Sequence, residues 1–357
     1  MRNIILKSSL FLSLFAFAAC GKDDEQLTTD NTYAQGVFVT CEGVWGVSSG
    51  VVTMYNPNTK TLIAEDLFQY VNNRQLGNVV QSIAFDNDYA YIVVNAANKV
   101  EIVNKNTWQE SAQITDVESP RFVEIIGDYI YISQWGSDGM TGAVKVYNRN
   151  DFSLKTTINT YAGAERLMLV DGKLWVTHTG GYGIDNRIAI IDLSTHTIDN
   201  TITLDYDNVI AIVKANDGSL WVACAGNSVY TNYPEIDSTL STPSALVQLS
   251  SNGNILKEVA LEVGGYANNM ALDMQNNILY FLYKEGIYSY NIATENLALF
   301  AEGTYYGVGF DNTKNELYIA RANGSNPSTI FRMIDINNII DSFSTGAAYA
   351  NGFNFQY

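Results

Sequence analysis

The sequence predicts an all-β fold, a seven-bladed β-propeller built from four-stranded blades. Three observations support this prediction. A short apolar alternation with one central aromatic residue recurs seven times. Each copy is flanked by further strand-like segments, and no 34-residue helical repeat is present. The C-terminal residues 350–357 match a strand that the first copy lacks.

The aromatic strand defines the repeat because it is the segment most alike between copies. The intervals between its aromatics run from 38 residues (Tyr280 to Tyr318) to 59 residues (Trp221 to Tyr280). Periods in this range, with several strands per unit, are typical of propeller blades. The seven segments are "GVFVTC" (36–41), "DYAYIVV" (88–94), "GDYIYIS" (127–133), "DGKLWVT" (171–177), "DGSLWVA" (217–223), "NNILYFL" (276–282) and "KNELYIA" (314–320).

The segments around each aromatic strand complete a four-stranded unit. A first strand precedes it, as in "QSIAFDN" (81–87) and "ERLMLVD" (165–171). A third strand follows, as in "KVEIVNK" (99–105), and then an Asn, Asp and Thr-rich turn leads to a fourth. Alternation with a period of two and short polar turns predict consecutive hairpins.

The first unit begins directly at its aromatic strand, at residues 33–41. The missing first strand is present at the other end of the chain, where "ANGFNFQY" (350–357) matches "YGVGFDN" (306–312). We therefore expect the C-terminal strand to complete the first blade, closing the ring and removing its open edges.

The N-terminal residues have the pattern of an exported lipoprotein. Residues 1–19 carry two basic residues and an apolar run of signal-peptide length, ending at "FAAC". This resembles a bacterial lipobox, in which Cys20 receives the lipid. Residues 20–32 then form an acidic tether, beginning "CGKDDE", and residues 33–357 form the propeller. The alternatives are an ordinary signal peptide with an incidental cysteine and a generic solvated linker.

The charge balance excludes several classes of partner. Without Arg2 and Lys7 the chain keeps 18 basic and 37 acidic residues, a formal charge of −19. Such a chain repels nucleic acid and anionic lipid, so we expect membrane contact only through the lipid anchor. Cys41 and Cys224 occupy equivalent positions in distant blades, which is too far for a disulfide, and are predicted to be small core residues.

The loops between the second and third strands and the loops between blades share one face of a propeller. In this chain they are rich in aromatic, amide and guanidinium side chains, which suit a broad ligand bearing amides or hydroxyls. The alternative is that these aromatics pack between blades and the arginines pair with local acids. The predicted ligand-binding residues are Trp45, Arg74, Gln134, Trp135, Arg166, His178, Tyr182, Tyr230, Asn269, Tyr306 and Arg321.

Catalytic signals are weak in this sequence. Only His178 and His196 are present, so a His-based zinc site is not expected, and we predict no metal and no cofactor. The chain contains no nucleophile elbow, phosphate loop or EF-hand loop. Carboxylates are plentiful, so a carboxylate-based hydrolase stays open. The expectation is a protein that is not an enzyme.

The first three repeats carry a family resemblance. "CEGVWGVSSGVVTMYNPNTKTL" (41–62), "LGNVVQSIAFDNDYAYIVVNAANKVEIVNKNTW" (76–108) and "SPRFVEI" (119–125) resemble the seven-bladed surface lipoproteins of Bacteroidetes, within the broader surface-layer and quinoprotein-like propellers. The resemblance extends over about residues 33–357. It is similar in kind to the cobalamin-capturing lipoproteins of vitamin B12 uptake. That resemblance implies a protein of the outer membrane, exposed on the cell surface, which holds a corrinoid and passes it to a TonB-dependent transporter.

Four hypotheses follow. The first is capture of cobalamin or a related corrinoid without covalent change. The second is binding of another nutrient, such as a glycan, beside a transporter. The third is a propeller enzyme of the lactonase or lyase kind, with a metal or a carboxylate–His pair in the channel mouth. The fourth is a structural or adhesive surface protein.

Overall fold

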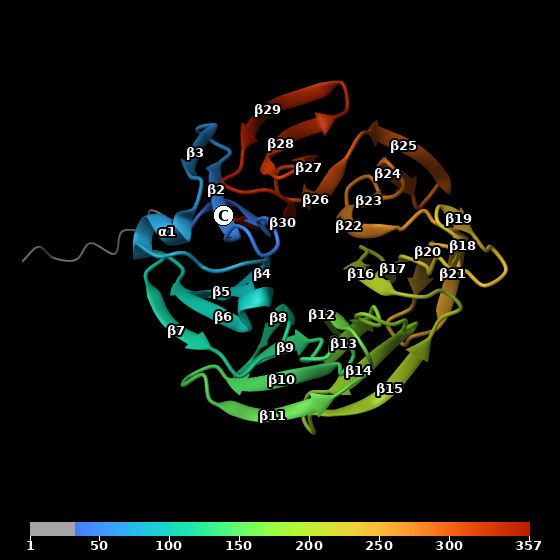
Figure 1. Ribbon diagram of the computed structural model, residues 1–357, viewed down its shortest axis with the longest axis horizontal. Coiled ribbons are helices and arrows are strands. Elements are labelled where there is room, and N and C mark those ends of the chain that lie inside the picture. The colour runs from blue at the N-terminus through green and yellow to red at the C-terminus, as the bar shows by residue number, and fades with distance from the viewer. Residues whose placement is uncertain (1–32) are drawn as a thin grey trace, which may run out of the picture.

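The computed structural model describes residues 33–357, and within these residues the strands form seven four-stranded antiparallel sheets. Figure 1 shows the sheets arranged as blades around a central axis. The predicted seven-bladed β-propeller is confirmed. The predicted signal peptide, Cys20 and the acidic tether lie outside the described residues.

Each blade contributes one strand at each of four distances from the axis. The innermost strands are β4 (Val80–Phe85), β8 (Pro120–Ile126), β12 (Ala164–Val170), β16 (Val209–Lys214), β22 (Asn268–Asp273), β26 (Tyr305–Asp311) and β30 (Ala350–Gln356). The second strands are β1 (Gly36–Cys41), β5 (Tyr89–Val94), β9 (Tyr129–Gln134), β13 (Lys173–His178), β17 (Leu220–Cys224), β23 (Ile278–Leu282) and β27 (Glu316–Asn323). The third strands are β2 (Val51–Asn56), β6 (Lys99–Asn104), β10 (Ala143–Asn148), β14 (Arg187–Asp192), β20 (Ala245–Leu249), β24 (Gly286–Asn291) and β28 (Asn326–Asp335). The outer strands are β3 (Thr61–Ala64), β7 (Glu110–Ile114), β11 (Leu154–Asn159), β15 (Thr197–Thr203), β21 (Ile255–Ala260), β25 (Asn296–Glu302) and β29 (Asn338–Ser344).

Burial falls from the middle of each blade to its outer edge. Every residue of β1 is buried, whereas β21 is exposed or half-buried along its whole length. The second strand is covered on both faces by neighbouring blades, so both of its faces carry apolar residues. The outer strand faces solvent, which explains its mixed composition.

The apolar core lies between the blades. Among residues 33–357, seven hydrophobic clusters each join residues of two neighbouring blades. Trp221 of β17, for example, lies 5.6 Å from Tyr290 of β24 in the next blade, measured between ring centroids. The aromatic residues that mark the repeat therefore pack between neighbouring blades.

The ends of the propeller meet in one blade. Strand β30 pairs with β1 in antiparallel register, from Gly36 opposite Gln356 to Cys41 opposite Ala350. The predicted closure by the C-terminal strand is confirmed. It leaves β1 paired on both sides, with β2 and β30, so the first blade has no open inner edge.

Three short elements lie in segments that the sequence predicted to be loops, one of them the single 3-10 turn η1 (Asn95–Ala97). Helix α1 (Leu67–Asn72) follows β3, with Asp66 accepting a hydrogen bond from the Gln69 N–H as its N-cap. Its Leu67 and Phe68 are buried, and packing of one apolar turn stabilises a helix too short to show periodicity. The long loop of the fifth blade contains a hairpin of β18 (Tyr230–Asn232) and β19 (Glu235–Ile236). Of the helices in residues 33–357, none has the length and apolarity needed to cross a membrane.

Candidate functional site

The loops between second and third strands and the loops between blades meet on one face of the propeller. The loop after β1 bonds the segment before β4, where the Gly50 N–H donates to the Gly77 carbonyl at 2.8 Å. In the sixth blade, the Lys284 N–H donates to the Gly265 carbonyl at 2.7 Å. The expected sharing of one face by these loops is confirmed, and the seven innermost strands start from it.

Each innermost strand has a register shift directly after its first residue. In β4, Val80 pairs with Val94 and Ser82 pairs with Val93, so Gln81 between them has no partner in the ladder. Shifts of this kind re-aim side chains and are frequent beside binding sites. The residues that the shifts leave unpaired, which we call the bulge residues, are Gln81, Arg121 with Phe122, Glu165 with Arg166, Ile210, Asn269, Tyr306 and Asn351.

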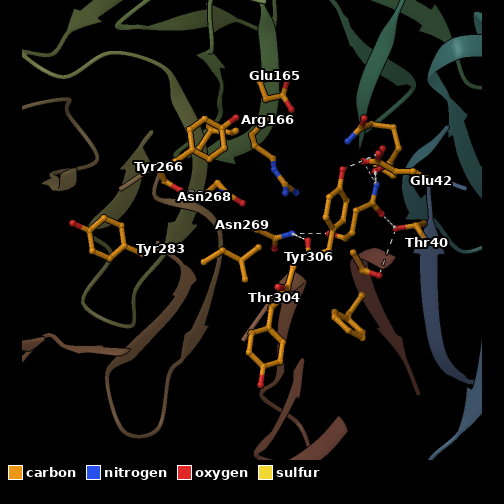
Figure 2. Close-up of a pocket in the computed structure, with 18 of the residues that line it drawn as sticks. Thr40, Glu42, Glu165, Arg166, Tyr266, Asn268, Asn269, Tyr283, Thr304 and Tyr306 are labelled. Carbon is orange, nitrogen blue, oxygen red and sulfur yellow. Dashed lines mark hydrogen bonds between the residues drawn. The ribbon is translucent and has the colours of Figure 1, made fainter. Parts of the chain in front are cut away.

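All of the bulge residues line one cavity of about 550 Å³ at the mouth of the central channel. Figure 2 shows side chains from different blades pointing into this space, among them Arg166, Asn269 and Tyr306. The volume lies in the range of small-molecule sites. Seven separate repeats thus build a single, mostly polar site.

Arg121 is fully engaged on one side of the cavity. Its guanidinium binds Glu165 through two hydrogen bonds, of 2.9 Å from Nε and 2.8 Å from Nη2. A third bond, of 2.6 Å, runs from Nη1 to the side-chain oxygen of Gln81. Trp135 places its ring 4.2 Å from the guanidinium carbon and donates its Nε1–H to Glu165 at 2.9 Å. These bonds neutralise the carboxylate and tie three blades together.

Glu42 lies on the other side of the cavity and is held by two donors. The Tyr306 hydroxyl donates to it at 3.0 Å and the Asn351 side-chain amide donates at 3.1 Å. Burial nevertheless raises the pKa of the Glu42 carboxyl, since desolvation outweighs these bonds. The Asn269 amide donates to the Asn351 carbonyl at 2.8 Å, which links the sixth blade to the closing strand β30.

Arg166 differs from Arg121 although the two residues come from neighbouring blades. Its guanidinium stacks on the Phe122 ring, with 4.0 Å from Cζ to the ring centroid. Within residues 33–357 this guanidinium has no hydrogen bond or ion pair. Burial lowers the pKa of Arg166 to about 10, because the charged form loses solvation, while Glu165 partly opposes that shift.

Exposed aromatic residues stand on loops of the same face of the propeller. Tyr266 lines the cavity and is 58% exposed, and Tyr182 packs edge-on against Trp135 with 5.9 Å between centroids. A Cβ on Gly139 would lie 2.2 Å from the Tyr182 ring, so the glycine permits this packing. The aromatic rim, as we call this set, comprises Trp45, Tyr182, Tyr230, Tyr233 and Tyr266.

The structure brings some of the predicted ligand-binding residues to the cavity. Arg166, Asn269 and Tyr306 line it, and Trp135 supports it through Glu165. Four further predicted residues are exposed on loops or strand ends of the same face, away from the cavity lining: Trp45, Tyr182, Tyr230 and Arg321.

The remaining three predicted residues lie within or between the blades. Gln134 is buried and accepts a hydrogen bond from the Glu118 N–H at 3.2 Å. His178 is fully buried, with Nδ1 3.2 Å from the Arg187 carbonyl, and burial lowers its pKa to about 4. Arg74 stacks on Phe68 and forms ion pairs with Glu101 and Glu110.

The predicted ligand-binding set omits several residues that line the cavity. Glu42, Gln81, Glu165 and Asn351 are among them. Except for Glu42, a signal for them is present, because Gln81, Arg121 and Glu165 are each the second residue of the first strand of a repeat. Aligning the repeats on that position would have found the cavity.

Two cysteines lie in the described part of the chain. Cys41 and Cys224 are both free and buried, as predicted. Burial raises the pKa of the Cys41 thiol to about 12. Within residues 33–357 no three His, Cys, Asp or Glu side chains are grouped as metal ligands.

Comparison with known proteins identifies a family and a fold. The family described as "Domain of unknown function (DUF5074)" matches residues 35–356. Among curated proteins, no relative of the chain was found.

Solved structures share the architecture at low sequence identity. A quinonprotein alcohol dehydrogenase-like protein from Bacteroides thetaiotaomicron is 14% identical, covers 90% of this chain and 78% of its own, and has a TM-score of 0.64. A protein from Lactobacillus plantarum is 14% identical over 90% of this chain and 100% of its own, with a TM-score of 0.62. The hydrazine synthase of Kuenenia stuttgartiensis is 15% identical over 76% and 86%, with a TM-score of 0.62. These likenesses support the fold alone.

Proposed function

The chain belongs to the DUF5074 family, and from that premise we propose that it is a binding protein that captures cobalamin or a related corrinoid without chemical change. The ligand would sit at the mouth of the central channel, on the face where the loops gather. The site would act by shape and hydrogen bonding, with no cofactor of its own.

The observation that carries this proposal is the repeated register shift of the innermost strands. Seven blades each direct side chains into one cavity. Apart from Phe122 and Ile210, those side chains are three amides, two guanidinium groups, a carboxyl and a phenol. Because the donors and acceptors stand on paired strands rather than on free loops, they are ordered before the ligand arrives. Such preorganisation lowers the entropic cost of binding.

A corrinoid matches this surface in chemistry and in breadth. Its periphery carries many amides, which exchange hydrogen bonds with groups such as Asn268, Asn269 and Tyr306. Its macrocycle is too broad for the cavity and would lie across the mouth, against the aromatic rim. Rigid aromatic side chains supply contact area at low entropy cost.

The cellular role in this proposal rests on the N-terminal sequence. Residues 1–19 would direct export, Cys20 would carry the lipid, and residues 20–32 would tether the propeller at the outer membrane, exposed on the cell surface. From there the protein would deliver its ligand to a TonB-dependent transporter. Proteinase K treatment of intact cells tests this placement: degradation of the propeller supports surface exposure, and full protection contradicts it.

The binding test uses the full chain solubilised in detergent. We expect cyanocobalamin to stay with the protein through desalting and to give a saturable titration. Tyr266→Ala removes an exposed rim side chain at the cavity and should weaken binding by about tenfold or more. Tyr70→Ala, on helix α1, removes another largely exposed tyrosine that does not line this cavity and should leave the affinity unchanged.

The same titration separates the alternatives. A flat titration with several corrinoids would refute the ligand assignment. Retardation of the protein in polysaccharide gels, abolished by Tyr266→Ala, would then assign the same site to a glycan. Loss of corrinoid binding in both tyrosine variants alike would also contradict the proposed position of the site.

A further inference from the structure

Two arginines on adjacent blades lie in the channel mouth. The guanidinium of one is hydrogen-bonded to protein side chains and that of the other is not. Arg121 has its guanidinium bonded to Glu165 and Gln81. Arg166 extends into the same cavity, as Figure 2 shows, and its guanidinium N–H groups have no hydrogen-bond partner in residues 33–357. A half-buried guanidinium without a partner is unusual, because desolvating a charge is costly unless it is paired.

The position of Arg166 is held by its surroundings rather than by a bond to its charged end. Its backbone N–H donates to the Thr177 hydroxyl at 3.1 Å, which stabilises the register shift of β12. The Phe122 ring covers one face of the guanidinium at 4.0 Å. Stacking leaves the N–H groups in the guanidinium plane available to a ligand, and that fork matches an oxyanion.

Two acidic side chains of the cavity already accept hydrogen bonds from residues other than Arg166. Glu165 is bonded by Arg121 and Trp135. Glu42 accepts hydrogen bonds from the Tyr306 hydroxyl and the Asn351 amide. Within residues 33–357 no carboxylate forms an ion pair with the Arg166 guanidinium, including Glu124, which lines an adjoining cavity together with Arg166.

The third acidic group of the cavity lining lies at its border. Glu285 stands in the loop after β23, where it is exposed to solvent. In the same loop, Lys284 forms an ion pair of 2.6 Å with Glu262. Neither of these charges removes the positive charge at Arg166.

We propose that Arg166 forms an anion subsite, which binds a carboxylate or a phosphodiester of the captured ligand in the channel mouth. This inference rests on the proposed function, and it adds that the ligand carries a negatively charged group directed into the cavity. Figure 2 shows Tyr266 and Asn268 on the same side of the cavity as Arg166, where their polar groups can complete the contact.

The test titrates two small anions, inorganic phosphate and acetate, into the full chain in detergent at constant ionic strength. Thermal melting and calorimetry provide the readouts. Phosphate, acetate or both should raise the melting temperature of the wild-type protein, and the more effective anion identifies the group that is bound. In Arg166→Gln the affinity for that anion should fall at least tenfold, and Arg166→Lys should keep part of it.

Lys155→Gln provides the matched control. It removes one positive charge from the exposed outer strand β11, far along the blade from the channel, and should keep wild-type anion affinity. Without anion, Arg166→Gln should melt no lower than wild type, because it removes a desolvated charge. Equal anion binding by wild type and Arg166→Gln overturns the subsite, as does an equal loss in Lys155→Gln.

A parallel corrinoid titration distinguishes the two proposals. If cyanocobalamin binds wild type and Arg166→Gln equally and neither anion binds, the subsite is refuted while the proposed function stands. If the anions bind through Arg166 and no corrinoid binds, the subsite stands while the proposed ligand is refuted.

Discussion

The guanidinium of Arg121 and the carboxylate of Glu165 face each other across the boundary between the third and fourth blades, with 2.8 Å between Nη2 and Oε1. Both residues stand at the register shifts of their innermost strands, β8 and β12. The shift that exposes a side chain to the channel also brings these two charges together. The site therefore contributes to holding the ring closed.

Breaking this pair should destabilise the propeller. Glu165→Gln leaves the Arg121 charge without a full partner in a place with little solvent, and we expect a loss of about 3 kcal/mol in the free energy of unfolding. Urea denaturation measures it. The double variant Arg121→Gln/Glu165→Gln should lose less than the sum of the single variants. Additive losses would show that the pair is not coupled.

Glu124 predicts a pH dependence of stability. It lies deeper in the channel, in a cavity of about 360 Å³ shared with Phe85 and Ile212, and burial raises its pKa to about 7 from an ordinary value of 4.5. Because the folded protein holds this proton more tightly, the group costs nothing below pH 4.5. Its cost grows as the pH rises from 4.5 to 7, to about 3 kcal/mol.

Glu124→Gln should remove that cost. The variant should be more stable than wild type at pH 8 by up to about 3 kcal/mol and equal to it at pH 4.5, as measured by denaturation at both values. Glu235→Gln, at an exposed carboxyl in β19, is the control and should change little at either pH. A gain for Glu124→Gln that is the same at both pH values would contradict the explanation by protonation.

Loss of the closing strand should destabilise every blade. Deleting residues 350–357 removes β30, which pairs with β1 and contributes Asn351 to the channel mouth. We expect a large fall in melting temperature with loss of the single cooperative transition, followed by circular dichroism. Deleting only Tyr357, which lies beyond β30, should have a much smaller effect. A chain without residues 350–357 that melts like the full chain would refute the role of the strand.

Cys41 and Cys224 should not react in the folded protein. Both thiols are fully buried, and burial raises the pKa of each, to about 12 for Cys41. In a Cys20→Ser chain at pH 8, a thiol reagent such as DTNB should detect no free thiol before denaturation and two after it. Rapid reaction of the native chain would contradict the described burial.

Several features of the fold were predictable because they are local and repeated. Trp175, Trp221 and their counterparts mark the second strand of each blade, and strand alternation follows from the pleat of the backbone. The likeness of residues 350–357 to the other first strands was enough to predict closure. Helix α1 escaped prediction because a single apolar turn, Leu67 with Phe68, has no periodicity to detect.

The site was predicted in part. The expectation that the loops share one face correctly predicted Arg166, Asn269 and Tyr306, which line the cavity. Gln134 and His178 lie at the ends of second strands, where sequence alone does not tell a loop position from the interior of a blade. Glu42 and Asn351 were missed because they meet only after the first and last strands join.

By itself the sequence determined the repeat, the number of blades and the closing strand, because each depends on hydrophobic alternation along a short stretch of chain. Only the tertiary structure decided which side chains face the channel, since that depends on one register shift in each of seven strands. It also decided that Arg121 is paired while Arg166 is not, because both outcomes depend on contacts between neighbouring blades. The pairing of charges in the channel mouth therefore depends on how the blades assemble into the ring.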